Sequence, residues 1–175
     1  MSEARVDERI LIPTNYFNGE NHLIREHDYQ FINPKSIYAK SKYEAEINIQ
    51  NHCNNFFIVR TSWLFGKHGG NFVKTMIKLL KTDNSFSVLQ NEYGTPTYTK
   101  HLANFLSELV KTDKYGIYHC SNYSEDTISW YEFAHEIERQ IGGHDIQFQS
   151  SVIQKTDSYE RPAKTPQSSG LDNFN

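Results

Sequence analysis

Tyr38 and Lys42, four residues apart in the stretch NPKSIYAKSKYEAE (residues 33–46), are the residues of this sequence most suited to chemistry. With 11 Tyr and 12 Lys among 175 residues, such a spacing is expected about once by chance, so the spacing alone decides nothing. The stretch has the character of a helix, in which residues four apart share one face and lie about 6 Å apart at Cβ. Both side chains can therefore point into one cleft.

A phenol beside an ammonium group can serve as a general acid or base. The pKa of a free phenol is about 10, and a neighbouring positive charge favours the phenolate. Such a tyrosine can donate a proton to a carbonyl oxygen while a hydride reaches the carbon. Thr14, at the end of an expected strand, is the available hydroxyl that could polarise the same oxygen. The alternative is a solvated Tyr and Lys that stack along a surface helix.

The elements that must position this pair form a strand, helix, strand unit. Residues 9–14 (RILIPT) and the start of residues 56–66 (FFIVRTSWLFG) are apolar runs that predict buried strands. Residues 36–51 between them predict the helix that carries the pair. The first strand delivers Thr14 to a loop, and the second ends on a loop around residues 62–70.

Apolar residues at helical spacing predict three further helices, near residues 73–80, 102–109 and 133–141. Thr99 is the expected N-cap of the second of these helices. Ser129 and Glu132 form a capping box at the start of the third. Short strands fit between these helices at residues 86–89 and 116–119.

Strands that alternate with helices indicate an α/β fold with a largely parallel sheet. At 175 residues the chain is long enough for one domain with a real core. The residues expected to be buried in that core are Val59, Phe105, Leu109, Phe133 and Ile137. The tail from Gln154 contains two prolines and indicates an extended loop.

Composition and charge argue against several classes of protein. The formal net charge is −3 and the Lys and Arg residues are scattered, so no nucleic-acid or membrane partner is expected. Cys53 and Cys120 show no Cys-x-x-Cys spacing and the eight His show no ligand spacing, so no metal site is expected. The sequence has no apolar leader and no run of 18 apolar residues, which makes the cytoplasm the expected location.

Several segments, in order, closely resemble one enzyme family. They are PTNYFNGE, NPKSIYAKSKYEAE, IVRTSWLFG, GGNFVKTM, YGTPTYTKHLA, GIYHCSN followed by TISWYEFA, and the tail RPAKTPQSSGLDN. Together they span about residues 11–173 and resemble the dTDP-4-dehydrorhamnose reductases, which are extended short-chain dehydrogenases/reductases. The resemblance implies a partial Rossmann-like parallel sheet with a small substrate-binding lobe, and NADPH or NADH as the cofactor.

The resemblance also implies catalytic and cofactor-binding roles. Tyr38 would be the proton donor to the C4 ketone of a dTDP sugar. Lys42 would bind the nicotinamide ribose and favour ionisation of the phenol, and Thr14 would complete the catalytic triad. Thr61 would contact the cofactor together with Tyr38 and Lys42.

A substrate site is implied in the same way. Tyr16 and Trp63 match aromatic positions that line the sugar pocket of the family. The alternative is that both are core aromatics at the ends of strands. Asn71, Phe72 and Lys164 fall where the substrate lobe of the family closes over the nucleotide sugar.

The sequence departs from the family pattern most strongly at its start. A dinucleotide-binding half needs a first strand, a glycine-rich turn and an acidic residue about 20 residues further on, whereas only 13 residues precede Thr14. The nearest glycine cluster, GKHGG at residues 66–70, has Phe72 where a third glycine would fall and indicates a flexible loop. Pro13 and Asn15 stand where the family favours Ser and Asp.

We therefore expect one truncated domain over residues 1–175. Residues 9–64 would form the strand, helix, strand part of the Rossmann sheet, and residues 65–175 mainly the substrate-binding lobe and the remaining strands. The expected function is NADPH-dependent reduction of dTDP-4-dehydro-L-rhamnose, with poor NADPH binding by this chain alone. Alternatives are a non-catalytic nucleotide-sugar-binding or subunit-like module, and another extended-family enzyme such as an epimerase. The expected partners are a dTDP sugar and either a second copy of the chain or a missing N-terminal half.

Overall fold

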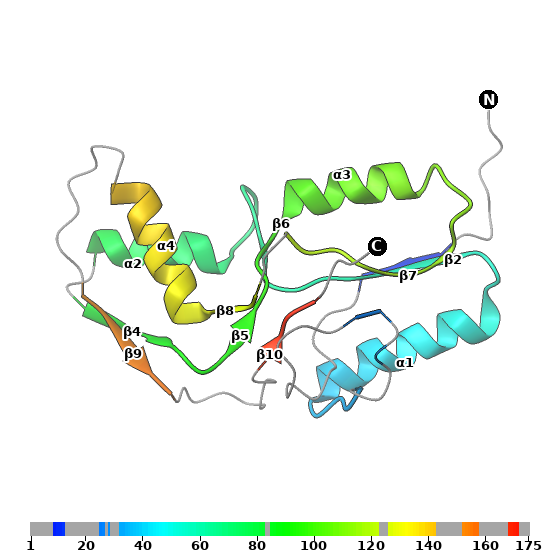
Figure 1. The fold of residues 1–175 in the computed structure, drawn as a ribbon, viewed down its shortest axis with the longest axis horizontal. Coiled ribbons are helices and arrows are strands. Elements are labelled where there is room, and N and C mark those ends of the chain that lie inside the picture. Colours follow the sequence, from blue (N-terminus) through cyan, green and yellow to red (C-terminus); the bar gives the residue numbers. More distant parts are fainter. Residues whose placement is uncertain are drawn as a thin grey trace.

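The computed structural model describes residues 9–12, 25–26, 28, 32–82, 85–122, 126–142, 152–157 and 168–171. Its helices, shown in Figure 1, are α1 (Ile37–His52), α2 (Phe72–Thr82), α3 (Thr99–Leu109) and α4 (Trp130–Gly142). Its longer strands are β1 (Arg9–Leu11), β2 (Phe56–Arg60), β4 (Ser85–Leu89), β7 (Gly116–His119) and β9 (Val152–Thr156). The two-residue strands are β3 (Leu64–Phe65), β5 (Tyr93–Gly94), β6 (Thr97–Tyr98), β8 (Ile128–Ser129) and β10 (Ser168–Ser169).

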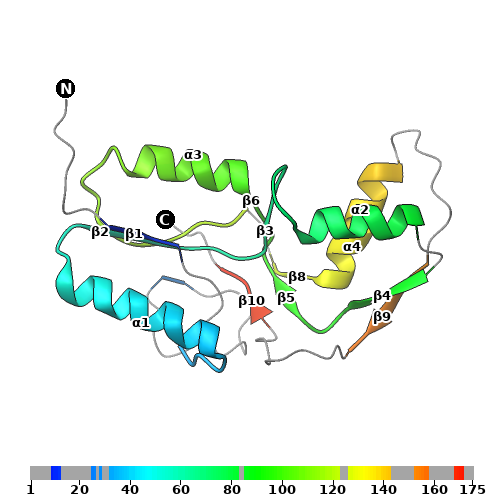
Figure 2. The ribbon, with the colours of Figure 1, turned by 180° about the vertical axis from the view of Figure 1, so that it is seen from behind.

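One end of the molecule is a three-layer sandwich. Its sheet has the order β1-β2-β7 with every pair parallel, as the alternation of strands and helices predicted. The helices α1 and α3 lie on opposite sides of this sheet in both ribbon views (Figures 1 and 2). The strand, helix, strand unit expected around residues 9–64 therefore exists as β1, α1 and β2, although the strand expected at residues 9–14 covers only Arg9–Leu11 in the described residues.

The middle strand β2 forms the core of this sandwich. Its residues Phe57, Ile58 and Val59 are fully buried. Because side chains alternate along a strand, Phe57 and Val59 share one face, where they pack with Leu102 and Leu109 of α3. The predicted core residues Val59 and Leu109 are thus confirmed as buried.

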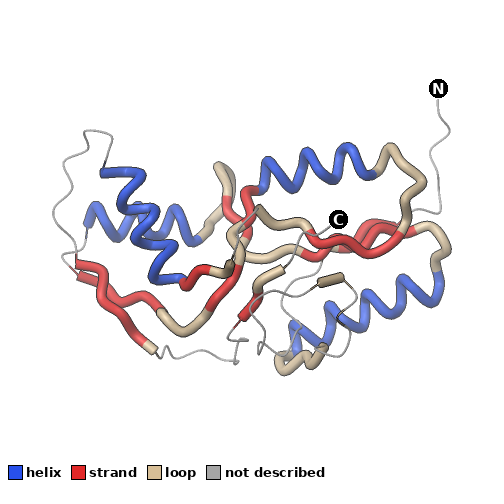
Figure 3. Tube along the Cα trace, in the orientation of Figure 1, coloured by secondary structure: helices blue, strands red, loops and turns tan. Residues whose placement is uncertain are grey.

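The other end of the molecule is a smaller lobe in which α2 and α4 pack together over the strand pair β4-β9 (Figures 1 and 3). Its buried cluster consists of Met76, Leu80, Val88, Phe133, Ala134, Ile137 and Ile153. The predicted core residues Phe133 and Ile137 are confirmed here, whereas Phe105 of α3 is only half-buried. The prediction of a loop from Gln154 is wrong at its start, because residues 152–156 pair in parallel with β4.

The N-termini of the helices test the capping residues expected from sequence. Ser36 is the N-cap of α1, and its side chain accepts a hydrogen bond from the backbone N–H of Ala39. The capping box of α4 is confirmed, since Ser129 Oγ accepts from the Glu132 N–H and the Glu132 carboxylate accepts from the Ser129 N–H. The prediction of Thr99 as an N-cap is wrong by one residue, because α3 begins at Thr99 and its N-cap is Tyr98.

The two ends are joined by short pairings between loop segments. The strands β3 and β6 pair in parallel, and a second small sheet has the order β10-β5-β8. In the part of the chain that the structure describes, no helix is long and apolar enough to cross a membrane.

We expect the substitution Leu109→Ala to lower the free energy of unfolding by about 2–5 kcal/mol, because it leaves a cavity against β2. Leu109 is 7% exposed, whereas Leu64 is 40% exposed and makes a matched control for the same chemical change. Leu64→Ala should cost less than about 1 kcal/mol. Denaturant unfolding measures both, and equal losses would contradict the packing of α3 on β2.

Candidate functional site

Tyr38 and Lys42 lie together on the first turns of α1. The Nζ atom of Lys42 is 5.5 Å from the centroid of the Tyr38 ring, a distance at which a cation and an aromatic face attract each other. Tyr38 is 54% exposed, whereas Lys42 is half-buried. The structure thus brings this predicted pair together on one helix face, with the phenol accessible to a ligand.

Polar residues that follow β2 occupy the carboxyl end of the sheet. Ser62 Oγ donates to the Thr95 carbonyl at 2.6 Å and lies 2.9 Å from Thr95 Oγ1. The same Thr95 hydroxyl accepts from the backbone N–H of Leu171 at 3.4 Å. These bonds tie the end of β2 to two segments that are distant in sequence.

Thr61, the predicted cofactor contact, is buried beside this cluster. Its Oγ1 has no hydrogen-bond partner among the described residues, and the same holds for Thr97 Oγ1. A buried hydroxyl without a protein partner usually bonds to water or to a ligand. The carboxyl end of a parallel sheet is also where ligands bind in open α/β folds.

Trp63 has an unusual backbone conformation at the same edge. Its φ of 45° lies in the left-handed region, which costs energy for a residue that is not glycine. Its indole stacks on Trp130 with ring centroids 3.5 Å apart and an angle of 8° between the planes. Gly94 allows this arrangement, since a Cβ there would lie 2.4 Å from Trp63 Cε2.

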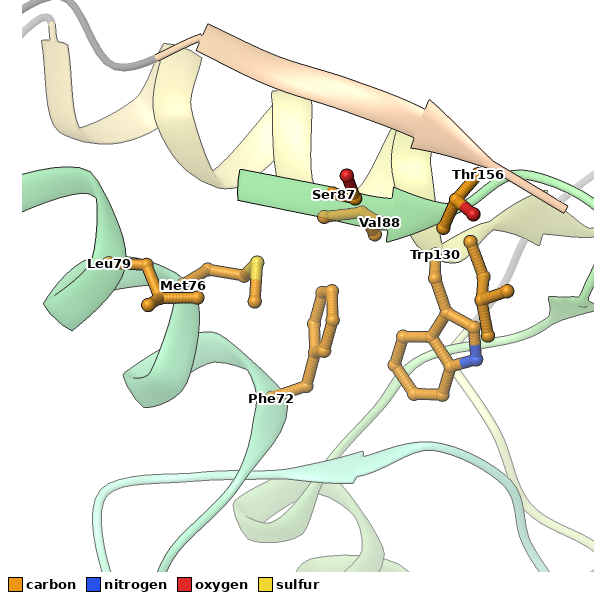
Figure 4. Close-up of a pocket in the computed structure, with 8 residues that line it drawn as sticks. Phe72, Met76, Leu79, Ser87, Val88, Trp130 and Thr156 are labelled. Carbon is orange, nitrogen blue, oxygen red and sulfur yellow. The ribbon is translucent and has the colours of Figure 1, made fainter. Parts of the chain in front are cut away.

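Asn71 caps the start of α2. Its side-chain amide donates to the Gly66 carbonyl at 2.8 Å, and its Oδ1 accepts from the Lys74 N–H at 3.2 Å. The side-chain amide of this predicted substrate contact is therefore bonded to the loop before α2, and its side-chain oxygen to the first turn of α2. Phe72, the next residue, begins the helix and turns its ring toward Trp130 (Figure 4).

A pocket of about 350 Å³ opens in the smaller lobe (Figure 4). Its lining residues are Phe72, Met76, Leu79, Ser87, Val88, Leu89, Trp130 and Thr156. The Trp130 ring contacts two of the aromatic residues predicted from sequence, with its centroid 3.5 Å from that of Trp63 and 4.5 Å from that of Phe72. Sequence reasoning missed Trp130, because its helical position and capping box predict a helix start and say nothing of a pocket wall.

The remaining predicted residues cannot be compared with this geometry. Thr14, Tyr16 and Lys164 lie outside the described residues. Within the described ranges, no group of three or more His, Cys, Asp or Glu side chains could hold a metal ion. Burial raises the pKa of the Cys120 thiol to about 11, so this cysteine stays protonated at neutral pH.

Comparison with known proteins relates this geometry to a family. Residues 9–175 match the family described as RmlD substrate binding domain. The chain belongs to that family. The fold is accordingly that of the extended short-chain dehydrogenases/reductases, and the α/β class with parallel sheets is confirmed.

Relatives in the RmlD family include reductases. The chain is 43% identical over 133 residues to the spore coat polysaccharide biosynthesis protein SpsK of Bacillus subtilis, covering 75% of this chain and 45% of that protein. It is 36% identical over 149 residues to the dTDP-4-dehydrorhamnose reductase of Aggregatibacter actinomycetemcomitans, covering 81% of this chain and 50% of that one. The chain thus spans about half the length of these relatives.

A solved structure agrees closely with the fold. The dTDP-4-dehydrorhamnose reductase of Bacillus anthracis, in complex with NADP, superposes with a TM-score of 0.84 at 34% identity. The match covers 94% of this chain and 56% of that protein. The described architecture is therefore that of one part of a longer reductase fold.

We expect Gly94→Ala to break the stack of Trp63 on Trp130, because the new Cβ would occupy space filled by the Trp63 indole. The chain has two Trp, so its intrinsic fluorescence and near-ultraviolet circular dichroism report on this pair. Gly70→Ala is the matched control, since a methyl group added there would have no atom within 4 Å. Unchanged spectra in Gly94→Ala would contradict the close approach.

Proposed function

We propose that this chain carries the catalytic and sugar-binding part of a reductase that converts the C4 ketone of dTDP-4-dehydro-L-rhamnose to a hydroxyl with NADPH. The observation that carries the proposal is the pair of Tyr38 and Lys42 on one face of α1, in a chain of the RmlD family. Relatives named dTDP-4-dehydrorhamnose reductase support the substrate class.

In the proposed reaction, Tyr38 is the proton donor. Bound NADPH supplies the hydride that C4 accepts. Tyr38 donates its phenolic proton to the ketone oxygen, so that C4 carries a hydroxyl. The Lys42 ammonium, close to the ring, stabilises the phenolate that remains. Thr14 would polarise the same oxygen.

Thr61 supports a nicotinamide site near α1. Its buried hydroxyl lacks a partner in the described part of the chain, so a polar group of the cofactor could satisfy it. We assign Thr61, Tyr38 and Lys42 to the nicotinamide riboside end of NADPH. The loop at residues 66–70 does not complete the glycine fingerprint, because Phe72 stands at the third glycine position. The diphosphate therefore needs groups from the rest of a complete enzyme.

The pocket beside Trp130 supports a site for the nucleotide. Its volume lies within the range of small-molecule sites, and Phe72 and Trp130 offer aromatic walls for a planar base. We assign the thymine base to this pocket. The other proposed contacts to the nucleotide sugar are Tyr16, Trp63, Asn71 and Lys164.

The edge of the larger sheet supports packing against a cofactor-binding unit. Among the described residues β1 pairs only with β2, and Ile10 of β1 is 48% exposed. Ile12 and Ile37 are also exposed, the first next to β1 in sequence and the second at the start of α1. An unpaired strand edge with apolar side chains readily accepts a further strand. We propose that a dinucleotide-binding α/β half covers this edge, rather than a second copy of the chain.

One observation favours a second candidate, a nucleotide-sugar-binding module without turnover. Described residues of the smaller lobe line the pocket, whereas the glycine loop at residues 66–70 does not complete a diphosphate-binding fingerprint. A module would bind the nucleotide and would not reduce the sugar. Turnover is the measurement that separates the two candidates.

We expect isothermal titration of the purified chain to show binding of dTDP and much weaker binding of NADPH, because a helix N-terminus with a glycine-rich turn provides most of the diphosphate anchoring. Phe72→Leu should weaken dTDP binding about tenfold through loss of the aromatic wall. Phe105→Leu, a matched change on α3 outside the pocket, should leave it unchanged. Failure of dTDP to bind would overturn the nucleotide site.

We expect Tyr38→Phe to lower turnover of the chain, supplied with the cofactor-binding half of a relative, by about 100-fold or more, because the proton donor is removed. Binding of dTDP should not change. Tyr43→Phe removes the same atom from the same helix and should retain turnover. Loss of NADPH absorbance measures the reaction. Equal turnover in the two variants would remove Tyr38 from the mechanism.

A further inference from the structure

The helix α1 is anchored differently from the other helices. The helices α2, α3 and α4 bury apolar residues such as Leu80, Leu109 and Phe133. The buried residues of α1 are Ala39 and Glu46. A carboxylate thus takes the place of an apolar side chain on the face of α1 that meets the sheet.

Glu46 is paired with Arg60 at the end of β2. Oε1 of Glu46 accepts hydrogen bonds from Arg60 Nε at 3.2 Å and from Arg60 Nη2 at 2.6 Å. The side chains are 0% and 2% exposed. The two donors of one guanidinium therefore converge on one carboxylate oxygen out of contact with water.

The same guanidinium reaches two further segments. Arg60 Nη1 donates to the Glu26 carbonyl at 2.8 Å and lies 3.4 Å from His119 Nε2 on β7. The Glu26 carboxylate in turn accepts from the His119 backbone N–H at 3.1 Å. Arg60 thus joins α1, β2, β7 and the segment before α1 at one point.

A buried ion pair of this kind specifies geometry more than it adds stability. Its desolvation cost offsets much of the attraction, and apolar replacements of similar volume are often neutral. The planar fork of an Arg, in contrast, accepts a partner only within a narrow range of directions. A helix whose buried carboxylate is held by such a fork is therefore constrained in rotation and in position along its axis.

Glu46 lies on the same side of α1 as the candidate catalytic pair. Tyr38, Lys42 and Glu46 are spaced at four-residue intervals, which places them on neighbouring turns. Because a helix is rigid over two turns, a shift at Glu46 moves Tyr38 and Lys42 with it.

We propose that Glu46 and Arg60 are positioning residues that set the rotation and axial position of α1, and through them the location of Tyr38 and Lys42 relative to the sheet. The catalytic meaning of this arrangement rests on the proposed function. The location of the helix itself does not, and it can be measured without turnover.

The contact between Ala39 and Leu171 reports on this location. These two residues form a small buried cluster, about two turns from Glu46 along α1. A purely local role of the ion pair would leave the Ala39 contact intact. A positioning role would not.

The test compares methyl nuclear Overhauser contacts and amide hydrogen exchange in Glu46→Gln and in the unmodified full chain. We expect the Ala39–Leu171 contact to be lost and amides of α1 to exchange about tenfold faster or more, with α2 and α4 unchanged. Glu136→Gln is the matched control, because it removes a carboxylate from an exposed ion pair with Arg139 on α4. It should leave the Ala39 contact and the α1 amides unchanged.

A second variant separates positioning from stability, and it also serves if Glu46→Gln fails to fold. The double variant Glu46→Met/Arg60→Met buries apolar side chains in place of the pair. We expect a melting temperature within a few degrees of the unmodified chain, without recovery of the Ala39–Leu171 contact. Retention of that contact in either variant would overturn the proposal, as would a double variant that does not fold.

The proposed function is tested by different measurements from those that test the position of α1. Binding of dTDP to the unmodified chain tests the nucleotide site, and that site lies in the other lobe. With the cofactor-binding half supplied, Glu46→Gln should lower kcat about tenfold or more and leave dTDP affinity unchanged. Absence of dTDP binding by the unmodified chain would overturn the proposed nucleotide site, and equal turnover of Tyr38→Phe and Tyr43→Phe would overturn the proposed reaction. Neither outcome would alter the result for α1.

Discussion

The rest of this structure depends on the burial of one strand, β2, between two parallel neighbours. Phe57, Ile58 and Val59 are fully buried, and burial continues through Arg60 and the residues that follow it. Buried polar groups must find partners, because leaving them unpaired costs more than most contacts provide. The apolar part of β2 therefore builds the core, and its polar end recruits segments from elsewhere in the chain.

Hydrogen bonds from the polar end of β2 connect the segments that join the two ends of the molecule. Ser62 bonds to Thr95, and Thr95 accepts from Leu171, so three segments far apart in sequence meet at the carboxyl end of β2. One residue further on, Trp63 adopts a left-handed backbone conformation and stacks on Trp130 of α4. Backbone strain at that point is offset by aromatic packing. The carboxyl end of β2 is thus coupled both to α1 and to the wall of the pocket.

The sequence predicted those features that depend only on residues close together in the chain. The capping box at Ser129 and Glu132 follows from residues three apart, and Tyr38 and Lys42 share a face because of helix geometry alone. Non-local pairings were not predictable. The strand β9 pairs with β4, more than 60 residues away, and its sequence VIQKT carries no alternation that would mark it. From sequence alone, Glu46 and Arg60 are expected to be exposed to solvent, because charged side chains are rarely buried unless they are paired.

The two ends of the molecule are built in different ways, and the difference agrees with the roles that we propose for them. The pocket is bounded by α2, β4, β9 and the start of α4, and most of the side chains that line it are apolar. Such walls tolerate small shifts, because apolar contacts have little directional preference. The proton transfer that we propose for Tyr38 requires angular precision, because proton transfer depends on hydrogen-bond geometry. A helix that meets the sheet through a directional ion pair suits that requirement better than one seated on an apolar stripe.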